Sequence, residues 1–307
     1  MNATRLAWVL ARVASAAVLL VTWGYGVTAL SPFAFDMFDR RCLAQGDSWF
    51  SIGALPPQFT TNLIIEMQLA RRTVIVQCAR PGKVLRRFTD TTREKDFLRM
   101  IKGPLAERWD AILISGAGND VIEAVGSQPT EPPERRLLRT PAERATGPLP
   151  GAGYLSEPGW QTFATHMRAV FNALVDLRDS GTNRFVPMVM HNYARLMPRP
   201  APAGPGQGPW LHPALDVYAV PAGDRLAVSD ALTHRVSALL QQLIDERLAA
   251  NPLCNLHLVD TRGQAGIVMA EPVAGTSGDW VNEIHLTPAG YDKCTALWAD
   301  VLDPILG

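Results

Sequence analysis

Ser48 follows directly after Gly46-Asp47, at the point where the apolar run 42–45 passes into a loop. A serine hydroxyl is a weak nucleophile until a base takes its proton and N–H donors stabilise the oxyanion that forms. The fold must therefore also supply a histidine, oxyanion donors and a group that orients the histidine. Alone, Gly-Asp-Ser is a common turn, in which Asp47 would only brace the loop through backbone hydrogen bonds. The interpretation of Ser48 depends on what else the chain carries.

Two later loops contain candidate oxyanion donors. "CARPGKVL" follows the apolar run 73–77 and contains Gly82, which could offer its backbone N–H. "ISGAGND" follows the run 111–115 and contains Asn119, which could offer its side-chain amide. The backbone N–H of Ser48 itself is a third candidate. A nucleotide site in the Gly-rich segment is disfavoured, because it lacks both the GxGxxG spacing and a Walker lysine.

The candidate base is His285, within "DWVNEIHLTPAGY", residues 279–291. This stretch follows the last predicted strand and precedes the last predicted helix, so His285 is expected to face the loop that holds Ser48. His191 ends another apolar run and is predicted to be a rim or substrate contact. Tyr193 and Trp280 are aromatic residues in loops on the same side, and we expect them either to line a substrate pocket or to pack in the core.

The elements that must position these residues alternate along the chain. Short apolar runs predict five strands at 42–45, 73–77, 111–115, 186–190 and 256–259. Helical periodicity predicts helices at 58–71, 94–109, 160–177, 232–243 and from residue 288 onward. Such alternation indicates a doubly wound parallel sheet with helices on both faces, where ligands bind beyond the carboxyl ends of the strands. Two long loops, 126–159 and 197–213, are expected to form rims of that cleft.

Four sequence blocks in this order resemble those of the SGNH (GDSL-type) hydrolases, over roughly residues 41–303. The blocks are Gly46-Asp47-Ser48, Gly82, Ala117-Gly118-Asn119-Asp120 and the stretch ending at His285. The resemblance implies a flavodoxin-like three-layer α/β/α fold with a five-stranded sheet. It further implies serine-based hydrolysis of carboxylic esters of lipids, cell-wall components or glycans through an acyl-enzyme, without a metal or organic cofactor.

The sequence departs from the family pattern at the residue that orients the histidine. The family carries an aspartate three positions before the histidine, where this chain has Asn282. An amide can hydrogen-bond an imidazole but cannot stabilise the imidazolium by charge. The site could therefore be a Ser-His dyad, or Asp279 or Glu283 could replace the missing carboxylate, with Asp279 preferred. A smaller departure is Ala117, where the family usually has glycine.

Three rival functions stay open at this level. An acyltransferase would use the same serine and pass the acyl group to a sugar hydroxyl. A binding module could have kept the fold while its triad decayed, and Asn282 supports that hypothesis. The chain could also be an α/β domain of unrelated function. Retention of Ser48, Gly82, Asn119 and His285 together favours an enzyme over a decayed site.

The N-terminal segment has a different character. Arg5 and Arg12 precede an uncharged run over residues 13–35, which is long enough to span a bilayer as a hydrophobic helix. We therefore divide the chain into a signal-anchor or signal segment, 1–35, and a hydrolase domain, 36–307. The expected location is membrane-anchored with the domain exported, or secreted after cleavage near Ala29. A buried N-terminal helix is the alternative.

Composition excludes several other classes. The chain of 307 residues has 29 basic and 29 acidic residues, and thus a net charge of zero, which disfavours a nucleic-acid partner. Four widely separated cysteines show no zinc-ligand spacing, so no metal site is predicted. In an exported protein they could form one or two disulfides, although buried free thiols are the simpler interpretation.

Overall fold

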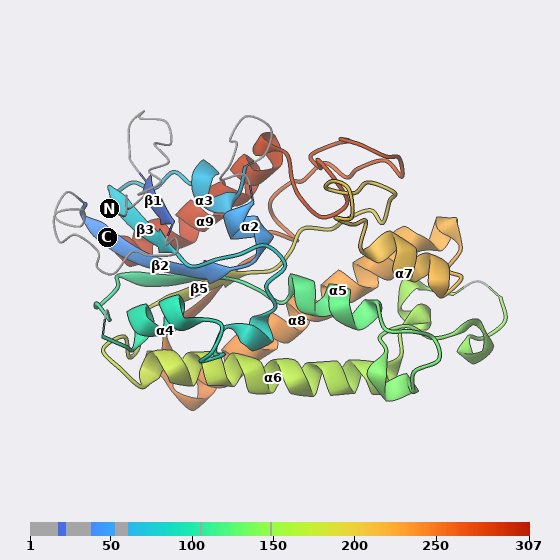
Figure 1. Cartoon of the computed structure of the whole chain (residues 1–307), viewed down its shortest axis with the longest axis horizontal. Coiled ribbons are helices and arrows are strands. Elements are labelled where there is room, and N and C mark those ends of the chain that lie inside the picture. The colour runs from blue at the N-terminus through green and yellow to red at the C-terminus, as the bar shows by residue number, and fades with distance from the viewer. Residues whose placement is uncertain (1–17, 23–37, 53–60, 105, 148) are drawn as a thin grey trace, which may run out of the picture.

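A parallel β-sheet lies at the centre of the protein (Figure 1). The computed structural model describes residues 18–22, 38–52, 61–104, 106–147 and 149–307. In these residues the sheet has the strand order β1-β3-β2-β4-β5-β6, with every neighbouring pair parallel. The strands are β1 (Val18–Thr22), β2 (Arg40–Gly46), β3 (Thr73–Gln77), β4 (Ala111–Ser115), β5 (Met188–His191) and β6 (Leu256–Val259).

Five of these strands are the predicted ones. Numbered among themselves, they follow the order 2-1-3-4-5, which is the flavodoxin-like arrangement. The predicted three-layer α/β fold is therefore confirmed. All strands are parallel, so the chain leaves β2, β3, β4, β5 and β6 at the same edge of the sheet, where the predicted site residues follow.

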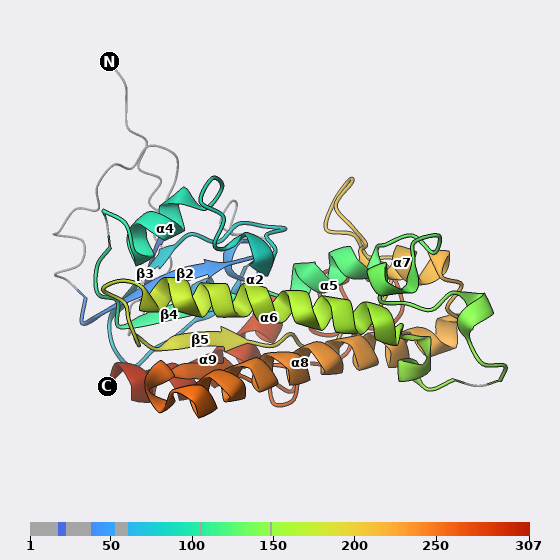
Figure 2. The same cartoon turned by 90° about the horizontal axis from the view of Figure 1, so that it is seen from below.

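Helices cover both faces of the sheet (Figures 1 and 2). One face packs against α4, α6 and α8, and the other against α3 and α9. Shorter helices, α2, α5 and α7, lie beyond the carboxyl ends of the strands. The bounds are α2 (Ser48–Ser51), α3 (Leu63–Glu66), α4 (Lys95–Ile101), α5 (Gly118–Val125), α6 (Glu157–Asp179), α7 (Leu211–Val217), α8 (Arg225–Ala250) and α9 (Pro288–Leu306). The helix predicted over 58–71 is longer than the observed one, because α3 is the only helix in the described residues of that range.

The strands alternate between two hydrophobic clusters. Leu43 and Ile112 face the layer of α4, α6 and α8, whereas Ile75 and Leu113 face the layer of α3 and α9. Because both faces are covered, apolar residues of the strands point to both sides of the sheet instead of alternating with exposed polar residues. Each fully buried aliphatic side chain of this kind contributes about 1.5–3 kcal/mol relative to exposure. The four cysteines are buried free thiols, as the simpler interpretation predicted.

The N-terminal strand β1 corrects one prediction. Residues 13–35 were expected to form a hydrophobic helix, but Val18–Thr22 pair in parallel with Thr73–Gln77 of β3. The sequence VLLVT contains β-branched residues, which favour a strand, and it extends the sheet beyond β3. The remaining residues of that segment lie outside the described part of the chain. Among the described helices, none is long and apolar enough to cross a membrane. Export and anchoring stay predictions.

The two long loops differ in what they approach. Loop 197–213 leads into α7 and brings Leu211 to the apolar pocket described below. Loop 126–159 contains three short 3₁₀ turns and contributes no described residue to that pocket. Its residues Glu134, Arg135, Arg136 and Leu137 instead line a separate hollow against α5 and α6. The expectation of two rims holds only for the second loop.

Candidate active site

Ser48 and His285 meet at the carboxyl edge of the sheet. Ser48 Oγ lies 2.8 Å from Nε2 of His285, a hydrogen-bond distance. Ser48 is the first residue of α2, and Asp47 caps this helix by accepting a hydrogen bond from the Trp49 amide at 3.0 Å. Glycine is required at position 46, because a Cβ there would lie 2.8 Å from the Cβ of Ser115. The turn from β2 into α2 thereby presents the Ser48 hydroxyl to the histidine.

The loop of His285 is fixed to the same turn. The indole Nε1 of Trp49 donates to the carbonyl oxygen of Ile284 at 3.0 Å. The ring of Trp210 packs edge-on against the imidazole, with centroids 5.7 Å apart. Burial lowers the pKa of His285 to about 4, because desolvation disfavours the imidazolium. At neutral pH the imidazole is therefore uncharged, as a general base must be.

Asn282 orients the imidazole. Its Oδ1 accepts hydrogen bonds from the backbone amides of Ile284 and His285, at 3.1 and 3.0 Å, and lies 3.0 Å from Nδ1 of His285. The two backbone donors require an oxygen at this position, so the Asn282 amide cannot be turned the other way. An oxygen only accepts, so Nδ1 carries the imidazole hydrogen. Nε2 then has its lone pair directed at Ser48.

The two carboxylates that were considered as replacements lie elsewhere. Asp279, the preferred candidate, accepts hydrogen bonds from the Val268 amide and from Lys293 Nζ, both at 2.6 Å. Glu283 accepts from backbone amides of the segment 199–212, including His212 at 2.7 Å, and so organises that loop. The expectation that Asp279 meets His285 is wrong, because the lysine and a backbone amide hold its carboxylate. Asn282 makes that contact instead.

The loop after β3 holds the first candidate oxyanion donor. Gly82 has a φ of +72°, which an L side chain rarely adopts, and it follows Pro81 in a turn closed by Lys83 N and Arg80 O at 3.3 Å. Lys83 is buried and donates to Glu94, Gln45 and the carbonyl of Cys78 at 2.6–2.9 Å. The buried lysine therefore anchors the turn to β2 and to the start of α4.

Asn119 lies on α5, opposite this turn. Its side-chain amide donates one hydrogen bond to the carbonyl of Lys83 at 3.0 Å. An amide has two N–H groups, so the second can point into the pocket that Asn119 and Ser48 both line. The helix begins at this point because Ala117, with φ of +91°, turns the chain out of β4. Alanine occupies a conformation that favours glycine, which is the residue that the family pattern has there.

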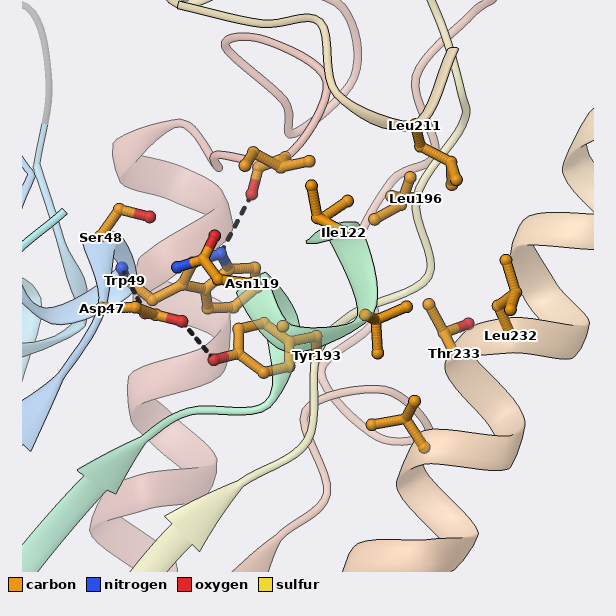
Figure 3. Close-up of a pocket in the computed structure, with 14 residues that line it drawn as sticks. Asp47, Ser48, Trp49, Asn119, Ile122, Tyr193, Leu196, Leu211, Leu232 and Thr233 are labelled. Carbon is orange, nitrogen blue, oxygen red and sulfur yellow. Dashed lines mark hydrogen bonds between the residues drawn. The ribbon is translucent and has the colours of Figure 1, made fainter. Parts of the chain in front are cut away.

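An apolar pocket extends from Ser48 toward α8 (Figure 3). Figure 3 shows Leu196, Leu211 and Leu232 on the side of the pocket away from Ser48. Further apolar side chains complete its lining: Val121, Ile122, Val236 and Ile284. The periodic pattern over 232–243 predicted the helix that carries Leu232 and Val236, but it assigned no pocket to them. Sequence reasoning missed that these two side chains line a pocket, because periodicity shows which face of a helix is buried but not where cavities lie along that face.

Tyr193 was expected either to line a substrate pocket or to pack in the core, and it lines this pocket. Its hydroxyl donates to Asp47 Oδ2 at 2.5 Å, and its ring lies so close to Gly118 that a Cβ there would be 2.8 Å from Tyr193 Cζ. His191 was predicted to be a rim or substrate contact, but its side chain is buried, with 0% exposed. Trp280, for which a pocket and the core were both expected, is also buried, with 1% exposed. His191 forms a hydrogen bond with Ser115, and Trp280 packs among the core residues near α9. Neither therefore lines the pocket.

No metal site is visible in the part of the chain that the structure describes. Within it, no group of three or more histidine, cysteine or acidic side chains is placed to hold an ion. The prediction that the reaction needs no metal or cofactor stays a prediction.

No protein-family model and no curated protein matches this chain. Solved structures do. Phospholipase A1 from Streptomyces albidoflavus is 12% identical, with 86% of this chain and 98% of that chain covered at a TM-score of 0.47. A carbohydrate acetylesterase from Sinorhizobium meliloti is 12% identical, with 86% and 99% covered at 0.45. A GDSL-like lipase from Bacteroides thetaiotaomicron is 13% identical, with 87% and 89% covered at 0.38. At this level of similarity, a function can be assigned to this chain only from the geometry of its own site.

Proposed function

We propose that this protein is a serine hydrolase that cleaves carboxylic esters. The observation that carries the proposal is the 2.8 Å contact between Ser48 Oγ and the Nε2 lone pair of His285, whose Nδ1 hydrogen is fixed by Asn282. This is the arrangement in which a histidine can remove the serine proton.

The reaction would proceed in two halves. Ser48 Oγ forms a bond to the ester carbonyl carbon while its proton passes to His285 Nε2. The backbone N–H groups of Ser48 and Gly82 and the Asn119 amide would stabilise the oxyanion. The bond to the leaving alcohol then breaks as His285 returns the proton, which leaves an acyl-enzyme. A water molecule attacks that ester by the same route, and the free acid and Ser48 are released.

The apolar pocket supports an aliphatic acyl group as the substrate's acid portion. Leucine, isoleucine and valine side chains form most of its lining beyond Ser48, and Thr233 is the polar exception on α8. Burial of each methylene of an acyl chain contributes about 0.8 kcal/mol. We therefore propose that the substrates are esters of medium or long aliphatic acids rather than acetyl esters.

The experiment is hydrolysis of p-nitrophenyl esters, from acetyl to palmitoyl, by the full chain. Turnover is expected to increase with chain length up to an optimum beyond acetyl. Ser48→Ala should reduce kcat by at least about 10⁴-fold. The matched control is Ser180→Ala, at the exposed end of α6, which should leave turnover unchanged. Unchanged activity in Ser48→Ala would contradict the proposal.

Two further measurements separate the alternatives. A fluorophosphonate should label Ser48 in the wild-type protein, and labelling elsewhere would contradict the assignment of the nucleophile. Leu232→Trp should fill the far side of the pocket and shift the chain-length optimum toward shorter esters. An unchanged optimum would contradict the acyl pocket alone. Product analysis with an added sugar alcohol distinguishes hydrolysis from acyl transfer.

A further inference from the structure

A second serine-histidine contact lies behind the nucleophile. His191 Nε2 lies 2.9 Å from Ser115 Oγ, and Ser115 Oγ lies 2.8 Å from Asp47 Oδ1. The three residues stand at the carboxyl ends of the neighbouring strands β2, β4 and β5. All are buried, with exposures of 1% for Asp47 and 0% for the other two. We call these three residues the rear network.

Counting hydrogens fixes the direction of these bonds. His191 Nδ1 lies 2.6 Å from the backbone carbonyl oxygen of Asn192, which can only accept, so Nδ1 carries a hydrogen. A neutral imidazole has no second N–H, and its Nε2 must therefore receive the hydroxyl hydrogen of Ser115. Ser115 Oγ then presents only lone pairs to Asp47. The Tyr193 hydroxyl lies farther from Ser115 Oγ, at 3.4 Å, and directs its hydrogen to Asp47.

An ionised Asp47 would leave this arrangement one hydrogen short. Its oxygens already accept from the Trp49 amide at 3.0 Å and from the Tyr193 hydroxyl at 2.5 Å. If Ser115 donates to the carboxylate, the buried Nε2 of His191 loses its donor. If Ser115 donates to His191, two acceptors face each other at 2.8 Å. A buried polar atom without a partner is unfavourable, so one additional proton completes the network.

The additional proton could reside on His191 or on Asp47, the two ends of the rear network. On His191 it would create an imidazolium packed among the rings of Trp49, Phe50 and Trp298. Burial opposes this, because desolvation lowers the pKa of His191 to about 4. Burial likewise raises the pKa of Asp47 to about 6, despite the hydrogen bond from Tyr193 that lowers it. A hydrogen bond from Ser115 to the carboxylate is among the interactions that hold this pKa down. Because Ser115 donates to His191 instead, that interaction is lost and the Asp47 carboxyl group keeps its proton to a higher pH.

The other titratable groups that act on Asp47 do not reverse this preference. They are Tyr193 and Tyr291, which are neutral acids, and Asp120, whose negative charge also raises the pKa of Asp47.

We propose that Asp47 is a carboxylic acid at pH 7, and that it donates its proton to Ser115, which in turn donates to His191. The residue before the nucleophile is then uncharged. This matters if Ser48 is the nucleophile, as proposed above, because a carboxylate one residue from the Ser48 N–H would oppose the oxyanion. Asp47, Ser115 and His191 are positioning residues, since they act through the turn that holds Ser48.

Carbon-13 NMR of protein labelled at the aspartate carboxyl carbon tests the proposal directly. The Asp47 signal, assigned by its loss in Asp47→Asn, should have the shift of a carboxylic acid at pH 7 and titrate above it, whereas an ordinary aspartate titrates near 3.9. Should that variant fail to fold, the signal is assigned by its displacement in His191→Phe. A carboxylate signal at pH 7, or a nitrogen-15 spectrum showing His191 as an imidazolium, overturns the proposal.

Two variants provide a readout that a purely structural role would not give. His191→Phe removes the acceptor that competes for the Ser115 hydroxyl, so the Asp47 midpoint should fall by at least one pH unit. Tyr193→Phe removes a donor to the carboxylate, so the midpoint should rise. Shifts of the same sign, or none, contradict the network. The measurement needs no ester hydrolysis, so it can succeed or fail independently of the proposed function.

Discussion

The two serine-histidine pairs of this molecule differ less in geometry than in what surrounds them. Ser48 and His285 are 2.8 Å apart, and Ser115 and His191 are 2.9 Å apart. In each pair an oxygen acceptor, from Asn282 or from the backbone of Asn192, holds the hydrogen on Nδ1 and leaves Nε2 facing the serine. Both histidines have a pKa lowered to about 4 by burial.

The difference lies in the third partner and in access. The Ser115 hydroxyl also contacts Asp47 and is fully buried, whereas Ser48 lines the apolar pocket. A catalytic triad has a carboxyl group beside its histidine, but His285 has the amide of Asn282 there. The nearby carboxyl group, that of Asp47, contacts Ser115 instead. A serine-histidine contact is a candidate for catalysis when a substrate can reach the serine, whereas a similar contact that no substrate can reach positions its neighbours.

Removing each histidine should separate the two pairs most strongly. His285→Gln removes the base and is expected to reduce kcat by about 10⁴-fold or more. His191→Phe keeps the base and should reduce kcat by less than about tenfold. Steady-state hydrolysis of the best p-nitrophenyl ester measures both, with circular dichroism to establish folding. If both variants fold and lose the same factor in kcat, the two serine-histidine pairs do not differ in function as expected.

A carboxylate beside His285 should make the Ser48–His285 pair a stronger catalyst. Asn282→Asp retains an acceptor for Nδ1 and adds the charge that stabilises the imidazolium, so kcat is expected to increase, by on the order of 10- to 100-fold. The expected gain is smaller than the 10⁴-fold effect of the serine-protease example, because Asn282 already fixes the correct tautomer. Asp279→Asn is the matched control and should change kcat by less than tenfold. A large loss in this control, with no gain in Asn282→Asp, would restore Asp279 as the orienting residue.

The smallest expected effect concerns pH. His285 acts as a base only when unprotonated, so activity is lost as pH falls through its pKa, which burial lowers to about 4. The value of kcat/KM should therefore change less than twofold between pH 7 and pH 5, whereas a histidine with an ordinary pKa near 6.5 would give a decrease of more than tenfold. In Asn282→Asp the added charge should move the acid limb upward. A limb near pH 6.5 in the wild type would show that His285 is more hydrated than its surroundings indicate.

Much of the fold follows from local patterns. Runs such as TVIVQ and AILIS coincide with β3 and β4, because strands covered on both faces carry apolar residues on both sides. The positions of Ser48 and His285 follow from the order of the strands, because parallel strands end at one edge. The strand at Val18–Thr22 could not be separated from a hydrophobic helix, since a long apolar run satisfies both patterns.

The partners of the site residues were harder to predict. Spacing alone made Asp279 and Glu283 plausible neighbours of His285, but their actual contacts depend on Lys293 and on backbone amides far away in the sequence. His191 was placed near the correct edge, yet its side chain turns inward to Ser115 instead of outward to the pocket. A side-chain direction in a loop depends on tertiary contacts that no periodicity records.

The hydrogen bond from the Trp49 indole to the Ile284 carbonyl has a consequence for biosynthesis. The two residues are 235 positions apart, and their contact joins the turn that carries Ser48, the proposed nucleophile, to the loop that carries His285, its proposed base. Contacts of such separation form late, because the intervening chain must first be ordered. During translation the serine leaves the ribosome long before the histidine exists. If His285 activates Ser48 as proposed, the serine stays unreactive until the C-terminal segments of the chain fold onto the sheet.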